Sequence, residues 1–172
     1  MRSKFLIYTI LFSLFTSQVI FSQSSKKKAD KDTNEWRYEI EVVGEGTQNT
    51  YQVKTWNYSK KPETAVEQAK KNAVHGIIFR GFPSRDRIQG KPALARDPNL
   101  EQEKEEFFAD FFATGGKYLK FVTVANNGAL GQGDVIKIGK EYKVGVVISV
   151  NVAMLRKDLE DAGIIKGLNN GF

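Results

Sequence analysis

The chain has 172 residues, a formal net charge of +6, a single histidine and no cysteine. The lack of cysteine excludes disulfides, thiolate metal sites, cysteine nucleophiles and a lipid anchor on a cysteine. Most of the net positive charge lies in the first 32 residues, so the remainder is close to neutral and lacks the gathered basic face of a nucleic-acid-binding protein.

The first 22 residues have the three-part layout of a secretory signal peptide. Arg2 and Lys4 give a positive start, residues 5–15 are almost all apolar, and Ser22 is a small residue where a signal peptidase would cut. The apolar run is shorter than the roughly 20 residues that span a bilayer, which makes a retained anchor the weaker alternative. We therefore predict cleavage near Ser22 and Gln23, a periplasmic or secreted protein, and no transmembrane segment after cleavage.

The polar, lysine-rich residues 23–34 are expected to form a linker, and residues 35–172 a single domain. Lys26, Lys27 and Lys28 give this linker a positive charge. A weak contact with an anionic surface is therefore a further expectation for the linker.

The domain is predicted to begin with an antiparallel hairpin. Apolar residues alternate with charged ones over residues 36–42, and a second alternating segment covers residues 51–58. Only a short Gly-containing segment separates the two, which favours antiparallel pairing.

Small residues then mark a helix that can lie close against a sheet. Pro62 suits the first turn of a helix, and Ala65, Ala69 and Ala73 follow at intervals of four. Residues 82–98 hold three prolines and several basic residues, and predict an unusually long irregular connection. A second helix is expected from about residue 99 to the glycines at 115–116, with an aromatic core side formed by Phe107, Phe108, Phe111 and Phe112.

Three further strands are expected at residues 118–125, 135–138 and 142–152, before a last helix around Leu155 and Leu159. The long strand at 142–152 has one continuous apolar face and should be central. Helices that do not alternate regularly with strands predict an α+β fold, with a small, mostly antiparallel sheet packed by two or three helices. The expected order is strand, strand, helix, long loop, helix, strand, strand, strand, helix.

The sequence offers few groups that could carry catalysis. His75 has no second histidine or cysteine with which to bind a metal, so we expect a surface or partly packed residue. A hydrolase using Glu103, Glu106 or Asp110 is an alternative, although acidic residues near a helix N-terminus already have an electrostatic reason. We therefore predict no catalytic, cofactor-binding or metal-binding residue, and no enzyme.

The aromatic residues of the hairpin are the first candidates for binding. Trp56 and Tyr58 lie with Lys54 on the second strand, on the face opposite Tyr51 and Val53. Left exposed, they would suggest a contact with a protein or a glycan. Covering by the long loop or the termini is the alternative.

The basic residues of the long connection are the second candidates. Arg85, Arg87 and Arg96 could bind an anion or a partner. A loop that only contributes solubility is the alternative.

The order of these elements resembles the N-terminal domain of flagellar assembly protein T and related small envelope lipoproteins. The resemblance covers about residues 62–162, and is carried by three features. They are the alanine-spaced helix, the Gly-Gly-Lys-Tyr-Leu-Lys-Phe-Val segment at 115–122, and the strand at 139–151 that runs into a Leu-x-x-x-Leu helix. The lipid-anchoring cysteine of the lipoproteins is absent here.

The resemblance implies an exported, non-catalytic domain that acts in envelope assembly through contacts with envelope proteins. Our expectation is therefore an interaction or assembly module of the cell envelope. A periplasmic binder of a small ligand or a cell-wall polysaccharide is the alternative function.

Overall fold

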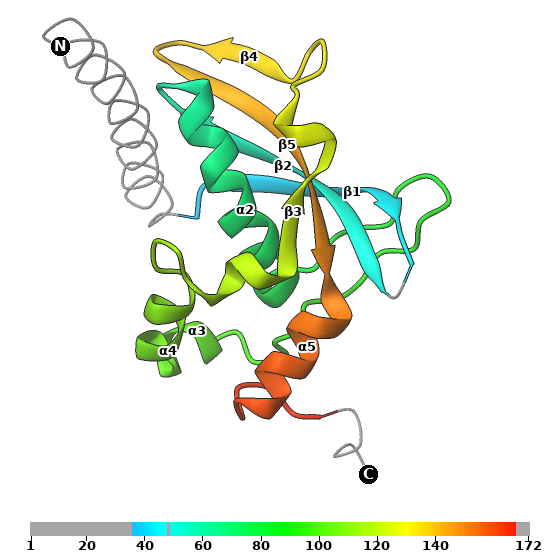
Figure 1. Ribbon diagram of the computed structural model, residues 1–172, viewed down its shortest axis with the longest axis vertical. Helices are drawn as coiled ribbons and strands as arrows, with labels where there is room; N and C mark the ends of the chain where they lie inside the picture. Colours follow the sequence, from blue (N-terminus) through cyan, green and yellow to red (C-terminus); the bar gives the residue numbers. More distant parts are fainter. Residues whose placement is uncertain (1–35, 48, 168–172) are drawn as a thin grey trace, which may run out of the picture.

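The computed structural model describes residues 36–47 and 49–167, which form a curled antiparallel sheet with helices on one face and at one end (Figure 1). This arrangement confirms the predicted α+β class. The predicted signal peptide and linker lie outside the described residues. The elements in chain order are β1 (Tyr38–Glu45), β2 (Thr50–Ser59), α2 (Pro62–Phe79), α3 (Leu100–Glu103), α4 (Glu105–Phe111), the 3₁₀ helix η1 (Lys117–Phe121), β3 (Val122–Val124), the 3₁₀ segment η2 (Ala125–Gly128), β4 (Val135–Ile138), β5 (Glu141–Asn151) and α5 (Val152–Asp161).

Strand β5 is central, as the sequence predicted. One of its edges pairs with β2 from Thr50↔Asn151 to Ser59↔Tyr142. Its other edge pairs with β4 near the start of β5 and with β3 near its end, and β1 pairs with β2 at the far side. The alternate side chains of β5 enter the core because they are apolar and almost completely buried: Val144, Val146, Ile148 and Val150.

Helix α2 lies across one face of this sheet, and small residues let it approach closely. Ala65, Ala69 and Ala73 are completely buried in the interface. At Gly76 a Cβ atom would lie 2.7 Å from the terminal carbon of Ile40 on β1, so the last turns of the helix need a residue without a side chain.

The predicted helix over residues 99–114 is broken into α3 and α4 at Lys104. In a continuous helix Lys104 would stand between Leu100 and Phe108, which lie four residues away on either side and are both buried. The break keeps the lysine exposed while both apolar residues reach the core.

The predicted strand at 118–125 is wrong over its first half, which forms η1. Tyr118 and Phe121 are both buried, although they are three residues apart. A strand would place them on opposite faces, whereas a 3₁₀ turn places residues three apart on the same side. Only Val122–Val124 continues as β3.

Helix α5 starts directly where β5 ends. The side chain of Asn151 accepts a hydrogen bond of 2.9 Å from the backbone N–H of Met154 and so caps the helix. Leu155 and Leu159 are completely buried, as predicted. Across residues 36–47 and 49–167, no helix has the length and apolarity needed to cross a membrane.

The close approach of α2 predicts that Ala69→Leu lowers the free energy of unfolding by about 1–3 kcal/mol, because added methylenes have no space between helix and sheet. Ala153→Leu, at an exposed position of α5, is the matched control and should change stability by less than about 0.5 kcal/mol. Urea-induced unfolding measures both. Equal stability of the two variants would contradict the close packing.

Candidate functional site

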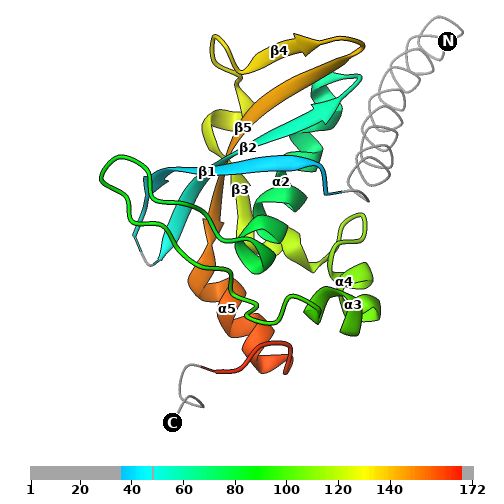
Figure 2. The same ribbon diagram turned by 180° about the vertical axis from the view of Figure 1, so that it is seen from behind.

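The face of the sheet opposite α2 carries the aromatic residues that the sequence singled out. Lys54, Trp56 and Tyr58 alternate along β2 with Thr55 and Asn57, which are completely buried on the α2 side. Figure 2 shows the molecule from this side, where no helix formed by residues 36–47 or 49–167 lies in front of the strands. We call this surface the open sheet face.

Charged side chains on the open sheet face are paired with one another across strands. Lys143 on β5 binds Glu39 on β1 with an Nζ–Oε1 distance of 2.7 Å. The hydrogen bond from Lys143 holds the pKa of Glu39 below its ordinary value, and Tyr58 donates a second bond of 3.0 Å to the same carboxylate. Arg37 binds Glu141 at 2.9 Å.

The cations of the open sheet face also cover its aromatic rings. The Nζ of Lys54 lies 4.6 Å from the centre of the Trp56 ring, and the guanidinium of Arg37 lies 4.3 Å from that of Tyr58. Lys143 lies within 6 Å of both rings, at 5.3 and 5.7 Å. The rings are therefore partly occupied by the protein's own cations.

Two loops reach the open sheet face through ion pairs. Arg85, from the long connection after α2, pairs with Glu41, which also accepts a bond of 3.2 Å from the indole N–H of Trp56. Lys54 pairs with Asp134, just before β4, at 2.5 Å. Through Glu41, Arg85 lies beside Trp56. Arg85 and the aromatic residues of β2 can therefore belong to one binding surface.

The remaining basic candidates lie elsewhere. Arg87 is exposed in the same connection and has no ion pair with another described residue. Arg96 is exposed at the other end of the connection, just before α3, and α3 lies toward the end of the molecule opposite β4 (Figure 1). Trp36 belongs to the alternating segment at 36–42 that predicted the first strand of the hairpin. Its ring lies on the α2 side of the sheet and stacks on His75, with ring centres 3.7 Å apart.

Strand β4 exposes apolar side chains that sequence reasoning missed as a binding feature. Val135, Ile136 and Ile138 are 40%, 44% and 48% exposed. Ile136 and Ile138 lie opposite Lys143 and Glu141 of β5, so both belong to the open sheet face. A short Val-Ile-Lys-Ile segment is typical of an ordinary buried strand, and only its position at the sheet edge reveals the exposure.

The outer edge of β4 also offers free backbone groups. A two-residue turn joins β4 to β5, so Ile138 and Glu141 form a hydrogen-bonded pair, and such pairs recur at every second residue. The bond from the Gly145 N–H to the Asp134 carbonyl fits this alternation. The N–H and C=O of Lys137 therefore point away from β5, to a side where the described residues place no strand.

His75 is buried rather than on the surface, and links three elements. The hydroxyl of Tyr38 on β1 lies 2.6 Å from its Nδ1, and both carboxylate oxygens of Glu101 on α3 lie 3.2 Å from its Nε2. The ring is only 3% exposed, between Trp36 and Phe79. With both nitrogens occupied by protein groups, His75 is a structural bridge between β1, α2 and α3.

The ionisation of this cluster follows from its burial. Burial lowers the pKa of His75 below its ordinary value, and the nearby Glu101 carboxylate does not compensate. Burial acts to raise the pKa of Glu101, but the hydrogen bond and charge of His75 outweigh it, so the carboxyl pKa is lowered. Burial raises the pKa of Tyr38 well above its ordinary value. A neutral imidazole thus accepts from Tyr38 and donates to ionised Glu101.

The carboxylates considered for a hydrolase do not converge on a site. Glu103, Glu106 and Asp110 are exposed on α3 and α4, and the carboxylate that meets His75 is Glu101. Within residues 36–47 and 49–167, no group of three or more histidine, aspartate or glutamate residues is placed to hold a metal ion.

Comparison with known protein families, with curated proteins and with solved structures finds no match to this chain. The resemblance to flagellar assembly protein T therefore stays a prediction.

The burial of His75 predicts that stability falls as the pH drops below about 6.5, the ordinary pKa of histidine. The unfolded chain then binds a proton at His75 that the folded protein, with its lower pKa, does not bind. Because the chain has no other histidine, the free energy of unfolding of the wild type should decrease between about pH 7.5 and 5.5.

The matched variant is His75→Gln. It should be less stable by about 1–3 kcal/mol at pH 7.5, because Tyr38 and Glu101 lose their partner, but nearly independent of pH over the same interval. Chemical denaturation at several pH values measures both. The same slope in variant and wild type would show that His75 does not cause it.

Proposed function

We propose that the protein is an exported, non-catalytic interaction module of the cell envelope that binds a partner protein through β4 and the open sheet face. The observation that carries this proposal is the exposure of Val135, Ile136 and Ile138 on a strand whose outer edge is unpaired among the described residues. A sheet edge with exposed apolar side chains is a template for a strand from another chain.

The contacts on the open sheet face favour a protein over a polysaccharide. A sugar ring binds an aromatic side chain by lying flat on it. Here cations already lie over both rings, Lys54 over Trp56 and Arg37 over Tyr58. A sugar would have to displace them and their ion pairs.

The charges near β4 indicate what the partner segment should contain. Lys137 and Lys140 are exposed, and neither makes an ion pair with another described residue. An extended segment in which apolar side chains alternate with acidic ones would bury Ile136 and Ile138 and meet both lysines.

Backbone pairing at β4 predicts that Lys137→Pro weakens partner binding at least tenfold, because proline removes the outward N–H and leaves the β4–β5 bonds in place. Lys137→Ala is the matched control: it keeps the N–H and should weaken binding only about two- to fourfold through the lost charge. The yield of a photo-crosslinker placed at Ile136, in cells that make the protein, measures both.

A second crosslinker position controls for indiscriminate capture. Met154 is 53% exposed on α5, and α5 lies far from β4 (Figure 1). Capture of the same partner from Met154 with equal yield, or unchanged capture by Lys137→Pro, would refute the β4 site. The crosslinked peptide of the partner should come from an extended acidic segment.

Export rests on the pattern of residues 1–22 and is tested separately. We expect the protein isolated from cells to begin at Gln23 and to occur in the periplasmic fraction or the medium. N-terminal sequencing and intact mass determine this. A chain that keeps residues 1–22 and fractionates with membranes would support a retained anchor instead.

A further inference from the structure

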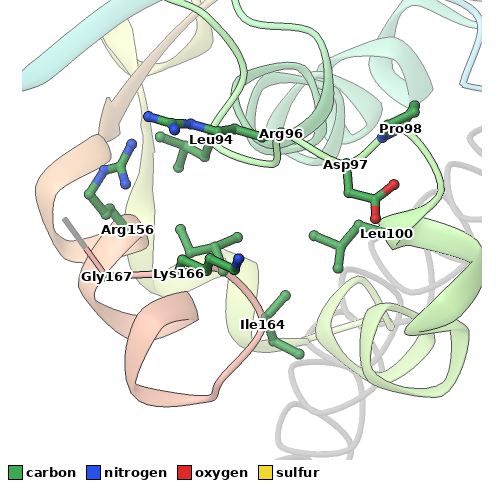
Figure 3. A pocket seen from close by; sticks show the side chains of 10 residues that line it. Leu94, Arg96, Asp97, Pro98, Leu100, Arg156, Ile164, Lys166 and Gly167 are labelled. Carbon is green, nitrogen blue, oxygen red and sulfur yellow. The ribbon is translucent and has the colours of Figure 1, made fainter. Parts of the chain in front are cut away.

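A pocket of about 640 Å³ lies between the end of the long connection and α5 (Figure 3). Helix α5 is at the end of the molecule opposite β4 (Figure 1). One wall is the end of the long connection, residues 94–98, followed by Leu100 at the start of α3. The other wall is Arg156 on α5 and the turn after that helix, residues 164–167. Its volume lies within the range of small-molecule sites.

Backbone hydrogen bonds hold both walls in place. The N–H groups of Leu94 and Ala95 bind the carbonyls of Ile77 and Ile78 in the last turn of α2, at 3.1 and 2.8 Å. The N–H of Ile164 binds the carbonyl of Leu159 at 2.9 Å and folds the turn back on α5. The pocket is therefore built into the fold and needs no rearrangement to form.

Apolar side chains form part of the inner surface of the pocket. Leu94, Leu100 and Ile164 belong to the buried core and are 8–9% exposed, and Ile165 packs against them. Figure 3 shows Leu100 and Ile164 toward one end of the pocket, with the carboxylate of Asp97 beside Leu100. An apolar group that enters the pocket would be removed from water together with the surface that these side chains still expose.

The other end of the pocket is basic. Figure 3 shows the guanidinium groups of Arg96 and Arg156 toward that end. Arg156 shares an ion pair of 3.3 Å with Glu160, whereas Arg96 and Lys166 make none with a described residue. Asp97 is the single acid of the lining, and its Oδ1 accepts the backbone N–H of Asn99 at 2.8 Å.

We propose that this pocket binds a fatty acid, with the acyl chain on Leu94, Leu100 and Ile164 and the carboxylate held by Arg96 and Arg156. Apolar side chains beside Arg96 and Lys166, which make no ion pair with a described residue, match a ligand with one apolar tail and one anionic head. Guanidinium groups suit a planar carboxylate, and the volume suits one chain rather than the two of a diacyl lipid.

The test is a calorimetric titration of the purified protein with dodecanoate, dodecanol and acetate. Dodecanoate should bind saturably at one site, dodecanol at least tenfold more weakly, and acetate without detectable heat. Methyl NMR signals of Leu94, Leu100, Ile164 and Ile165 should shift with dodecanoate. Equal binding of dodecanol and dodecanoate, or shifts confined to other methyl groups, would overturn the proposal.

Matched variants test the head-group contact. Arg96→Gln should weaken dodecanoate binding at least tenfold, whereas Arg87→Gln, in the same connection but outside the pocket, should change it less than twofold. Neither Arg96 nor Arg87 makes an ion pair with another described residue. Neither variant therefore loses an ion pair, and both should fold. Equal affinities of the two variants would refute the site, as would preference for vesicles of anionic diacyl phospholipid over dodecanoate. The pocket and the β4 surface share no residue. The dodecanoate experiment can therefore fail while the β4 crosslinking experiment succeeds, and the reverse.

Discussion

The close contact between α2 and the sheet is the constraint on which the rest of the structure depends. The helix axis lies near the strands because the residues between them are small: Ala65, Ala69 and Ala73. At Gly76 the missing side chain makes room for Ile40 of β1. Helix α2 covers one face of β2 and β5, and no helix of the described residues lies over the other face. The open sheet face is the face of these strands that α2 does not cover.

The last turns of α2 organise the opposite side of the molecule. His75 joins α2 to Tyr38 on β1 and to Glu101 on α3. One turn later, the carbonyls of Ile77 and Ile78 fix the long connection that leads to α3. A neutral, fully hydrogen-bonded histidine fits this role, since a buried polar group stabilises a fold only when its partners are present.

The two surfaces that follow from this arrangement differ in chemistry. The open sheet face and β4 carry paired charges and exposed apolar side chains beside a strand edge that no other described strand pairs with, which suits an extended protein segment. The pocket between the long connection and α5 combines apolar side chains with basic groups at one end, which suits a small amphiphile. Their separation allows both to be occupied at once.

The sequence by itself determined the local features that depend on periodicity. The hairpin, the alanine helix beginning at Pro62, the central position of β5 and the face of Lys54, Trp56 and Tyr58 all follow from which side chains can share a buried face. Contacts between distant segments decided the rest. The break at Lys104 and the 3₁₀ turn of η1 arise because the core accepts particular side chains at fixed places. The burial of His75, the exposure of β4 and the separation of Arg96 from Arg85 depend on which element lies beside which, and alternation along one strand or helix carries no information about that.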